Sequence, residues 1–186
     1  MYLSCSGGCD STALFYFFVE LQRRLGFSLA VVHINYGLRG KESDRDENFI
    51  KHLAEEHCIQ VKFLKAPLKE KSAGTQLWAR SIRYNHYKEL VQDGWLVALA
   101  HTQDDIAENV LLRMARGTSP RYLKGMSAEF HGILRPFLSL SKASLLSWFQ
   151  REKKVFCEDS SNQTHQYTRN IIRHDILAGL EKLYPG

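Results

Sequence analysis

The sequence contains few of the features that mark secreted, zinc-binding or membrane-spanning proteins. Its 186 residues include four cysteines, and none of them forms a C-x-x-C pair or a cysteine and histidine pattern with zinc-ligand spacing. The apolar run Ala13–Leu21 is interrupted by Glu20 and is far shorter than the ~20 residues that cross a bilayer. No secretory signal pattern is visible. We therefore expect reduced, mostly buried cysteines in a cytoplasmic protein with no membrane partner.

Internal repeats and low-complexity segments are absent as well, which favours one ordinary globular domain. The chain length suits a single α/β domain, and a hydrophobic share of 44% is enough for a substantial core. A net charge of +5 and a pI near 9.0 permit a nucleic-acid partner without requiring one. The chain stops at Tyr184–Gly186, directly after a predicted helix, so we expect a fragment of a longer protein.

Strand-like and helix-like segments alternate along the chain. Short apolar runs predict strands over Tyr2–Cys5, Leu29–Ile34, Gln60–Leu64 and Trp95–Ala100. Helical periodicity predicts a first helix that ends at Gly26, followed by helices over Ser43–His57, Gln76–Val91, Asp104–Arg116, Ser141–Lys153 and Tyr167–Leu183. This alternation predicts an α/β fold, a Rossmann-like parallel sheet with right-handed crossovers and helices on both faces.

The most informative stretch is Ser6–Ser11, which reads S-G-G-C-D-S between the first predicted strand and the first predicted helix. Gly7 and Gly8 allow successive backbone N–H groups to converge on an anion, and the helix adds its positive N-terminal end. The Asp10 carboxylate fits such a site as a Mg²⁺ ligand or as a helix cap. A plain serine and glycine turn is the alternative. The spacing is neither G-x-x-x-x-G-K-S/T nor G-x-G-x-x-G, the two commonest nucleotide-binding motifs. The stretch also contains no lysine that could bind the terminal phosphates of a nucleotide.

Two further loops follow predicted strands at the edge where open α/β sheets bind ligands. In His33–Gly40, Arg39 supplies a fork for phosphate or carboxylate, although a polar turn is the alternative. In the other loop, His101, Asp105 and Glu108 are spaced i, i+4, i+7, so they share one helix stripe. We expect this stripe to face outward from the core, opposite an apolar face formed by Ala107, Val110, Leu111 and Met114.

The stripe has several possible uses. Its two carboxylates and its imidazole suit Mg²⁺, a cationic substrate or proton transfer. An acidic helix start that is favoured by the helix dipole is the alternative without function. Two basic clusters could clamp phosphates of ATP or of RNA: Arg80, Arg83 and Tyr84 on one predicted helix, and Arg169, Asn170 and Arg173 on the last one.

The loop S-G-G-x-D-S resembles the PP-loop of N-type ATP pyrophosphatases, which cleave ATP between its α and β phosphates. Over nearly the whole chain, further stretches resemble the catalytic domain of tRNA(Ile)-lysidine synthetases. They are His33–Arg39, Ala79–Tyr84, Ala100–Glu108, Arg116–Gly117 with Arg135–Pro136, and Glu158–Asn162 with Tyr167–Asn170. The sequence departs from this family at Tyr36, Ile106 and Asn109, where His, Gln and Thr are usual.

This resemblance implies that residues 1–186 form an ATP pyrophosphatase catalytic domain that lacks C-terminal tRNA-binding domains. It implies a reaction in which ATP adenylates the wobble cytidine of the CAU anticodon of tRNA(Ile), and the lysine ε-amine then displaces AMP. The implied cofactors are therefore ATP and Mg²⁺, and the implied partners are L-lysine and tRNA(Ile). Whether the protein forms a homodimer stays an open question. Residues implied to bind the nucleotide are Ser6, Gly7, Gly8, Cys9, Asp10, Ser11, His33 and Arg80.

The resemblance also implies a set of catalytic residues, namely Asp10, Arg80, His101, Asp105, Glu108 and Arg169. Asp10 and Asp105 are the implied metal ligands, and the division of the acidic stripe between metal and lysine stays open. Two alternatives remain. A tRNA sulfurtransferase of the same superfamily would also adenylate a base, but sulfur delivery usually uses paired cysteines, which are missing here. A nucleotide-regulated RNA-binding module would bind ATP without releasing pyrophosphate.

Overall fold

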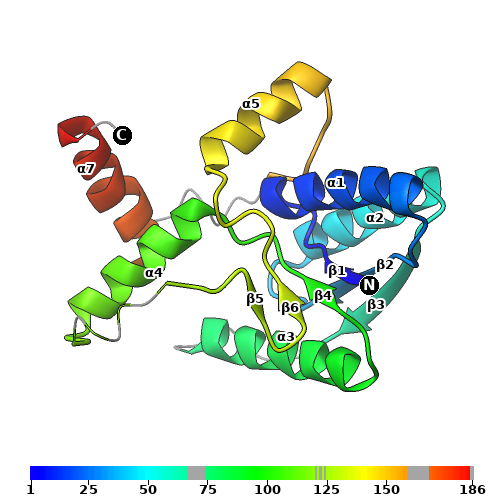
Figure 1. The fold of residues 1–186 in the computed structure, drawn as a ribbon, viewed down its shortest axis with the longest axis horizontal. Helices are drawn as coiled ribbons and strands as arrows, with labels where there is room; N and C mark the ends of the chain where they lie inside the picture. The colour runs from blue at the N-terminus through cyan, green and yellow to red at the C-terminus, as the bar shows by residue number, and fades with distance from the viewer. Residues whose placement is uncertain (67–73, 120, 122, 124, 159–167, 185–186) are drawn as a thin grey trace.

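A mostly parallel sheet forms the centre of the molecule (Figure 1). The computed structural model describes residues 1–66, 74–119, 121, 123, 125–158 and 168–184. The strands are β1 (Tyr2–Ser4), β2 (Ala30–Asn35), β3 (Gln60–Lys65), β4 (Val97–Ala98), β5 (Glu129–Phe130) and β6 (Ile133–Leu134). They lie in the order β3-β2-β1-β4-β6-β5, and only β5 runs antiparallel to its neighbour.

Helices cover both faces of the sheet, as the alternation of strands and helices predicts. The helices are α1 (Cys9–Leu25), α2 (Lys41–Glu56), α3 (Thr75–Gln92), α4 (Gln103–Ala115), α5 (Lys142–Glu152), α6 (Thr168–Ile171) and α7 (Ala178–Leu183). A π-helical segment, η3 (Ile172–Leu177), joins α6 to α7. In Figure 1, α1 and α2 lie on one side of the sheet and α3 lies on the other.

Two apolar cores result from the alternation of side chains along the strands. Leu3 of β1 pairs with Val31 of β2 and with Ala98 of β4, and all three point into a core shared with α1, α2 and α5. Val32 and Val97 point the opposite way, into a smaller core beneath α3. The C-terminal ends of β1, β2 and β4 therefore meet at one edge of a sheet that is held from both faces.

Most predicted elements exist within a few residues of their expected bounds. Gly26 ends α1 in a left-handed conformation with φ 70°, and Ser141 caps α5, both as expected. The predicted strand Trp95–Ala100 is reduced to Val97–Ala98, although Leu96 and Leu99 still form backbone hydrogen bonds with Tyr2 and Leu134. The hairpin of β5 and β6 was not predicted, since strands of two residues leave no periodic pattern.

The predicted environment of α4 is wrong for its apolar face and for Glu108. Its expected apolar face is not a core face, because Met114 is 54% exposed and Val110 and Leu111 are half-buried. The buried residue of α4 is instead Glu108, at 0% exposure. The reason is that η3 packs against α4 and covers Glu108, the last residue of the acidic stripe that we expect to face outward, while His101 and Asp105 stay partly exposed.

Two other sequence expectations concern the cysteines and the membrane. All four cysteines are free thiols, but only Cys5 and Cys9 are buried, while Cys157 is half-buried and Cys58 is exposed. Among the described residues, no helix has the length and apolar character needed to cross a membrane.

Candidate functional site

The loop after β1 is shaped for an anion. Gly7 has φ 89°, a left-handed value that favours glycine, and its carbonyl oxygen accepts hydrogen bonds from Thr12 Oγ1 and from the Cys157 N–H, both at 2.9 Å. Gly8 precedes α1 as its N-cap residue and has no side chain to cap the first turn. The N–H groups of that turn and the positive end of the helix dipole therefore lie at the mouth of the loop, where they would stabilise phosphate.

A pocket of about 340 Å³ lies at the C-terminal edge of the sheet. Its walls come from the loop after β1, the ends of β2 and β4, helix α3, the first turns of α4 and α5, and η3. The pocket brings together eight of the residues predicted from the sequence, namely Ser6, Gly8, Cys9, Asp10, Ser11, Arg80, His101 and Asp105. Gly7, His33 and Glu108 do not line it. Arg169 belongs to α6, but its side chain lies outside the described part, as does the predicted motif from Asp159 to Tyr167.

Asp10 is the most unusual carboxylate of the pocket. Its Oδ2 lies 3.9 Å from Lys142 Nζ, while its Oδ1 is buried and has no hydrogen-bond partner among the described residues. Burial raises the pKa of Asp10; the positive charge of Lys142 lowers it, and the nearby carboxylate of Asp105 raises it. A buried carboxylate oxygen without a partner fits a cation ligand, so Asp10 suits Mg²⁺.

The start of α4 is held by its own acidic residues. Asp105 Oδ2 accepts the Thr102 N–H at 2.9 Å and forms a capping box with it. His101 Nδ1 accepts a hydrogen bond from the Nε of buried Arg135 at 3.2 Å. An arginine can only donate, so the proton of neutral His101 is on Nε2. This arrangement fixes an imidazole and a carboxylate at the pocket wall.

Glu108 takes a different place from the one predicted. It is fully buried, and its Oε1 accepts a hydrogen bond from Arg173 Nε at 2.5 Å. Arg173 in turn lines the pocket. Glu108 therefore acts from beneath the surface, where its charge neutralises and orients an arginine that faces the ligand space.

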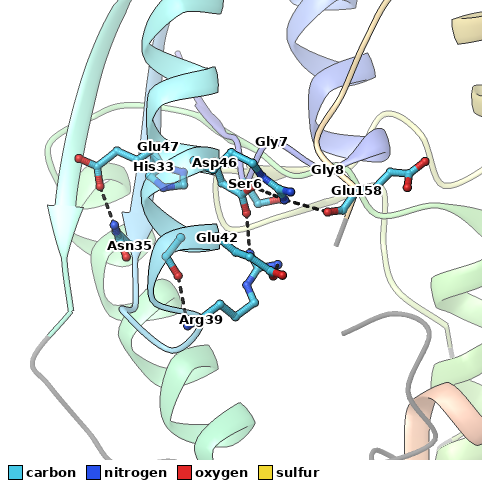
Figure 2. A network of polar contacts seen from close by, with 12 residues as sticks. Ser6, Gly7, Gly8, His33, Asn35, Arg39, Glu42, Asp46, Glu47 and Glu158 are labelled. Carbon is cyan, nitrogen blue, oxygen red and sulfur yellow. Dashed lines mark hydrogen bonds and ion pairs between the residues drawn. The ribbon is translucent and has the colours of Figure 1, made fainter. Parts of the chain in front are cut away.

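The Arg39 fork is already occupied by a carboxylate. Arg39 Nη2 donates to Asp46 Oδ2 at 2.7 Å, and Arg45 Nη2 donates to Asp46 Oδ1 at 3.0 Å and to the Glu158 carbonyl oxygen at 2.9 Å. Figure 2 shows this network beside the loop residues Ser6–Gly8. Buried Asp46 thus ties the loop after β2 to α2 through Arg39, and Arg45 of the same helix ties the segment at Glu158 to α2.

His33 and Cys9 support the loop rather than offering reactive groups. His33 lies in β2, and its Nδ1 donates to the Cys5 carbonyl oxygen at 2.9 Å, because a carbonyl can only accept. Burial lowers the pKa of His33 and favours its neutral form. Burial raises the pKa of the Cys9 thiol to about 12, an effect that neighbouring Asp10 strengthens, so Cys9 is a poor nucleophile.

Helix α3 supplies an aromatic and basic wall. The Arg80 guanidinium lies 4.6 Å from the centre of the Tyr84 ring, and Arg83 lines the pocket beside it. Tyr36 packs edge-on against Trp78, and its buried hydroxyl has no hydrogen-bond partner among the described residues. Stacked arginines and tyrosines suit a nucleotide, because they offer both ring faces and positive charge.

Lys142 is a site residue that sequence reasoning missed, and Arg135 was recognised only as part of the motif Arg135–Pro136, without a role. Lys142 is the first residue of α5, and Arg135 precedes Pro136 after β6. The sequence around Lys142 gives only a weak signal. Lys142 follows a recognisable helix cap at Ser141, but it belongs to no phosphate-binding motif. Only the packing of α5 across the sheet edge brings it to Asp10.

Comparison with known proteins agrees with this geometry. Residues 1–180 match the family model of the PP-loop domain. The chain belongs to the PP-loop domain family. Relatives include proteins named tRNA(Ile)-lysidine synthase from Parabacteroides distasonis, 36% identical over 189 residues, and from Thermosipho africanus, 32% identical over 189 residues. These alignments cover 97% and 98% of this chain but 42% and 44% of the relatives, so the chain spans about two fifths of their length.

A solved structure shares the fold of this PP-loop domain. It is the U34-tRNA thiolase NcsA from Methanococcus maripaludis with its 4Fe-4S cluster, which matches with a TM-score of 0.77 and 18% sequence identity. The match covers 100% of this chain and 67% of that chain. At this identity, the likeness speaks for the mostly parallel α/β architecture alone.

Proposed function

We propose that this chain is the catalytic domain of a tRNA(Ile)-lysidine synthase, which uses ATP to ligate lysine to the wobble cytidine of the CAU anticodon of tRNA(Ile). The observation that carries the proposal is the composition of one pocket: the loop Ser6–Ser11, which includes the Asp10 carboxylate, lines the same space as the carboxylate of Asp105. Such a pocket can take a polyphosphate and a cationic amino acid together. The names of the relatives supply the substrates that fit this combination.

In the first step, the wobble cytidine attacks the α phosphate of ATP and pyrophosphate leaves. The loop N–H groups and the first turn of α1 would hold the phosphates, while Arg80 and Arg173 offset the charge that develops in the transition state. Asp10 would hold Mg²⁺, with Asp105 as a second carboxylate nearby. A bound Mg²⁺ ion would supply charge neutralisation on the leaving pyrophosphate.

The described residues hold no group of three or more His, Cys, Asp and Glu side chains arranged for a metal ion. This is compatible with Mg²⁺, which usually keeps several waters and binds one or two carboxylates together with substrate phosphates. The chain's own contribution is then the single unpaired oxygen of Asp10 and the negative charge around it.

In the second step, the lysine ε-amine forms a bond to the cytidine carbon and AMP leaves. The ε-ammonium must first lose a proton, and the pocket offers the Asp105 carboxylate to bind the ammonium and accept that proton, while the Nε2–H of His101 can donate a hydrogen bond to the substrate. Glu108 would contribute through Arg173, since its own side chain is buried. Arg169, the remaining predicted catalytic residue, is proposed from the sequence motif alone.

The proposal also covers the domains, the compartment and the oligomeric state of the enzyme. Residues 1–186 would be the catalytic domain, and further domains that bind tRNA would complete the protein, since the relatives are more than twice as long as the chain. A tRNA substrate implies a cytoplasmic enzyme. We also propose that a second copy of this chain is a partner, in a homodimer. Sedimentation of the purified chain tests this.

The direct test is ATP-dependent transfer of labelled lysine to a CAU-anticodon tRNA(Ile) transcript, beside the same transcript with uridine in place of the wobble cytidine. The proposal expects label in the first transcript only, together with release of AMP and pyrophosphate. Pyrophosphate release without lysine transfer would point to another acceptor. Nucleotide binding without pyrophosphate release would favour a binding module instead of an enzyme.

A sulfur-transferring enzyme is the alternative that the solved neighbour suggests. That neighbour is named as a thiolase with an iron–sulfur cluster, but the sequence of this chain has no C-x-x-C pair. Cys5, Cys9 and Cys157 do line the pocket, yet burial raises the pKa of each of these thiols, so they stay protonated. Labelled sulfide offered in place of lysine separates the two reactions.

A further inference from the structure

Lys142 places a positive charge beside the loop Ser6–Ser11, which has no basic residue of its own. The stretch Ser6–Ser11 contains no lysine or arginine. The structure brings Lys142 of α5 to the same place, with its Nζ 3.9 Å from Asp10 Oδ2 and its side chain 29% exposed along the pocket wall. The ammonium therefore lies beside the loop that would hold the phosphates.

The backbone of Lys142 is anchored by α4. Its N–H donates to Asp104 Oδ2 at 2.8 Å, and the N–H of Gln103 donates to the Leu140 carbonyl oxygen at 2.9 Å. Ser141 Oγ accepts the N–H of Ser144 at 3.2 Å and caps the helix. The first turns of α4 and α5 are thus joined to each other, so the stem of Lys142 begins at a fixed point.

The charges around Lys142 show what holds it when no ligand is bound. Asp10 is its ion-pair partner, and the charges that act on Asp10 are those of Lys142 and Arg173 on one side and of Asp104 and Asp105 on the other. A cation on Asp10 would take over the role of Lys142 as its counter-charge. The ammonium would then be free to turn to a second anion within reach of its flexible side chain.

We infer that Lys142 is the phosphate-binding lysine of this site: it pairs with Asp10 in the free protein and binds the pyrophosphate part of ATP once Mg²⁺ and nucleotide enter. This inference rests on the proposed function. No bond is made or broken by Lys142 in this role. It contributes by charge and position, and its ammonium keeps its proton throughout.

The test compares Lys142→Gln, Lys142→Arg and the control Lys51→Gln, which changes an exposed lysine on α2. Calorimetry measures the binding of pyrophosphate with Mg²⁺ and of AMP to each purified protein. Loss of a charge-assisted contact weakens binding by about tenfold or more. Lys142→Gln should therefore bind pyrophosphate about tenfold more weakly and AMP as the wild type does, while Lys142→Arg should recover most of the affinity.

A second readout moves in the opposite direction. Binding of Mn²⁺ without nucleotide, followed by electron paramagnetic resonance, should be as tight or tighter in Lys142→Gln, because Asp10 loses its competing counter-charge. Equal pyrophosphate binding by Lys142→Gln and wild type would overturn the inference, as would a parallel loss of AMP binding, which indicates a structural role. If the wild type itself binds neither ATP nor pyrophosphate, the proposed nucleotide site fails and the inference with it.

Discussion

Glu108 and Arg173 form an ion pair between α4 and η3, with 2.5 Å between Glu108 Oε1 and Arg173 Nε. The carboxylate is completely buried, while the arginine is 25% exposed and reaches the pocket. The pair joins the C-terminal segment of the described chain to the helix that follows β4. The position of a pocket arginine thus depends on a carboxylate that does not itself line the pocket.

Replacing Glu108 by Gln should cost both stability and activity. The substitution keeps the shape of the side chain but leaves Arg173 without its counter-charge, and removing one partner of a buried pair typically costs about 3–5 kcal/mol. Urea unfolding measures the loss, and pyrophosphate release should fall with it. Glu20→Gln is the control, since the exposed pair of Glu20 and Arg24 is worth about 0.3–0.5 kcal/mol. Equal losses in the two variants would contradict the role of Glu108.

The buried position of Glu108 also shows where sequence reasoning fails. Within α4, the carboxylate lies opposite the apolar residues, so the local pattern predicts that it faces water. Its partner Arg173 is 65 residues away in the chain, and only the packing of η3 brings it there. The same holds for Lys142 and Asp10, which belong to different helices. The loop Ser6–Ser11 was predictable because its residues act together within one strand, turn and helix.

Asp10→Asn should abolish turnover while the fold stays intact. The amide keeps the size of the carboxylate but removes the charge that would hold Mg²⁺, so lysine transfer and pyrophosphate release should fall at least about 10²-fold. Circular dichroism should show the same helix content and the same shape of the melting curve as in the wild type. The control is Asp93→Asn at the exposed end of α3. Turnover of Asp10→Asn at the wild-type rate would refute the role of Asp10 at the metal.

His33 should make the protein less stable in mild acid. Burial lowers the pKa of His33 from 6.5 in the folded state, although the hydrogen bond to Cys5 opposes this. Below pH 6.5 the unfolded chain therefore binds more protons than the folded one, and stability is lost as the pH falls towards the folded pKa. Urea unfolding at pH 7 and pH 5 should show this decrease.

The variant His33→Asn keeps an N–H donor for the Cys5 carbonyl oxygen but cannot titrate. It should show a smaller fall in unfolding free energy between pH 7 and pH 5 than the wild type. His57, whose pKa burial also lowers, accounts for part of the remaining fall. The control His52→Asn changes an exposed residue of α2. If His33→Asn and the wild type lose the same unfolding free energy between pH 7 and pH 5, the pKa of His33 is the same in the folded and unfolded states.

Asp46→Asn should weaken substrate binding more than the chemical step. Asp46 is 3% exposed and receives hydrogen bonds from Arg39 and Arg45, which tie the loop after β2 to α2 (Figure 2). Loss of its charge should destabilise the fold by about 3 kcal/mol, the low end of the range for buried pairs, because the Arg39 and Arg45 side chains are 28% and 51% exposed. The loosened loop lines the proposed nucleotide pocket through Arg39, so KM for ATP should rise while kcat changes less.

The control for Asp46 is Glu42→Gln, because Glu42 lies 3.9 Å from Arg39 Nη1 and its side chain is 38% exposed. An exposed pair of this kind contributes about 0–1 kcal/mol, so stability and KM should stay close to those of the wild type. A fall in kcat with unchanged KM in Asp46→Asn would place Asp46 in the chemical step instead. That outcome would mean that Arg39 acts on the transition state, whereas the observed geometry, with the Arg39 guanidinium bound to Asp46, favours a role in shaping the loop.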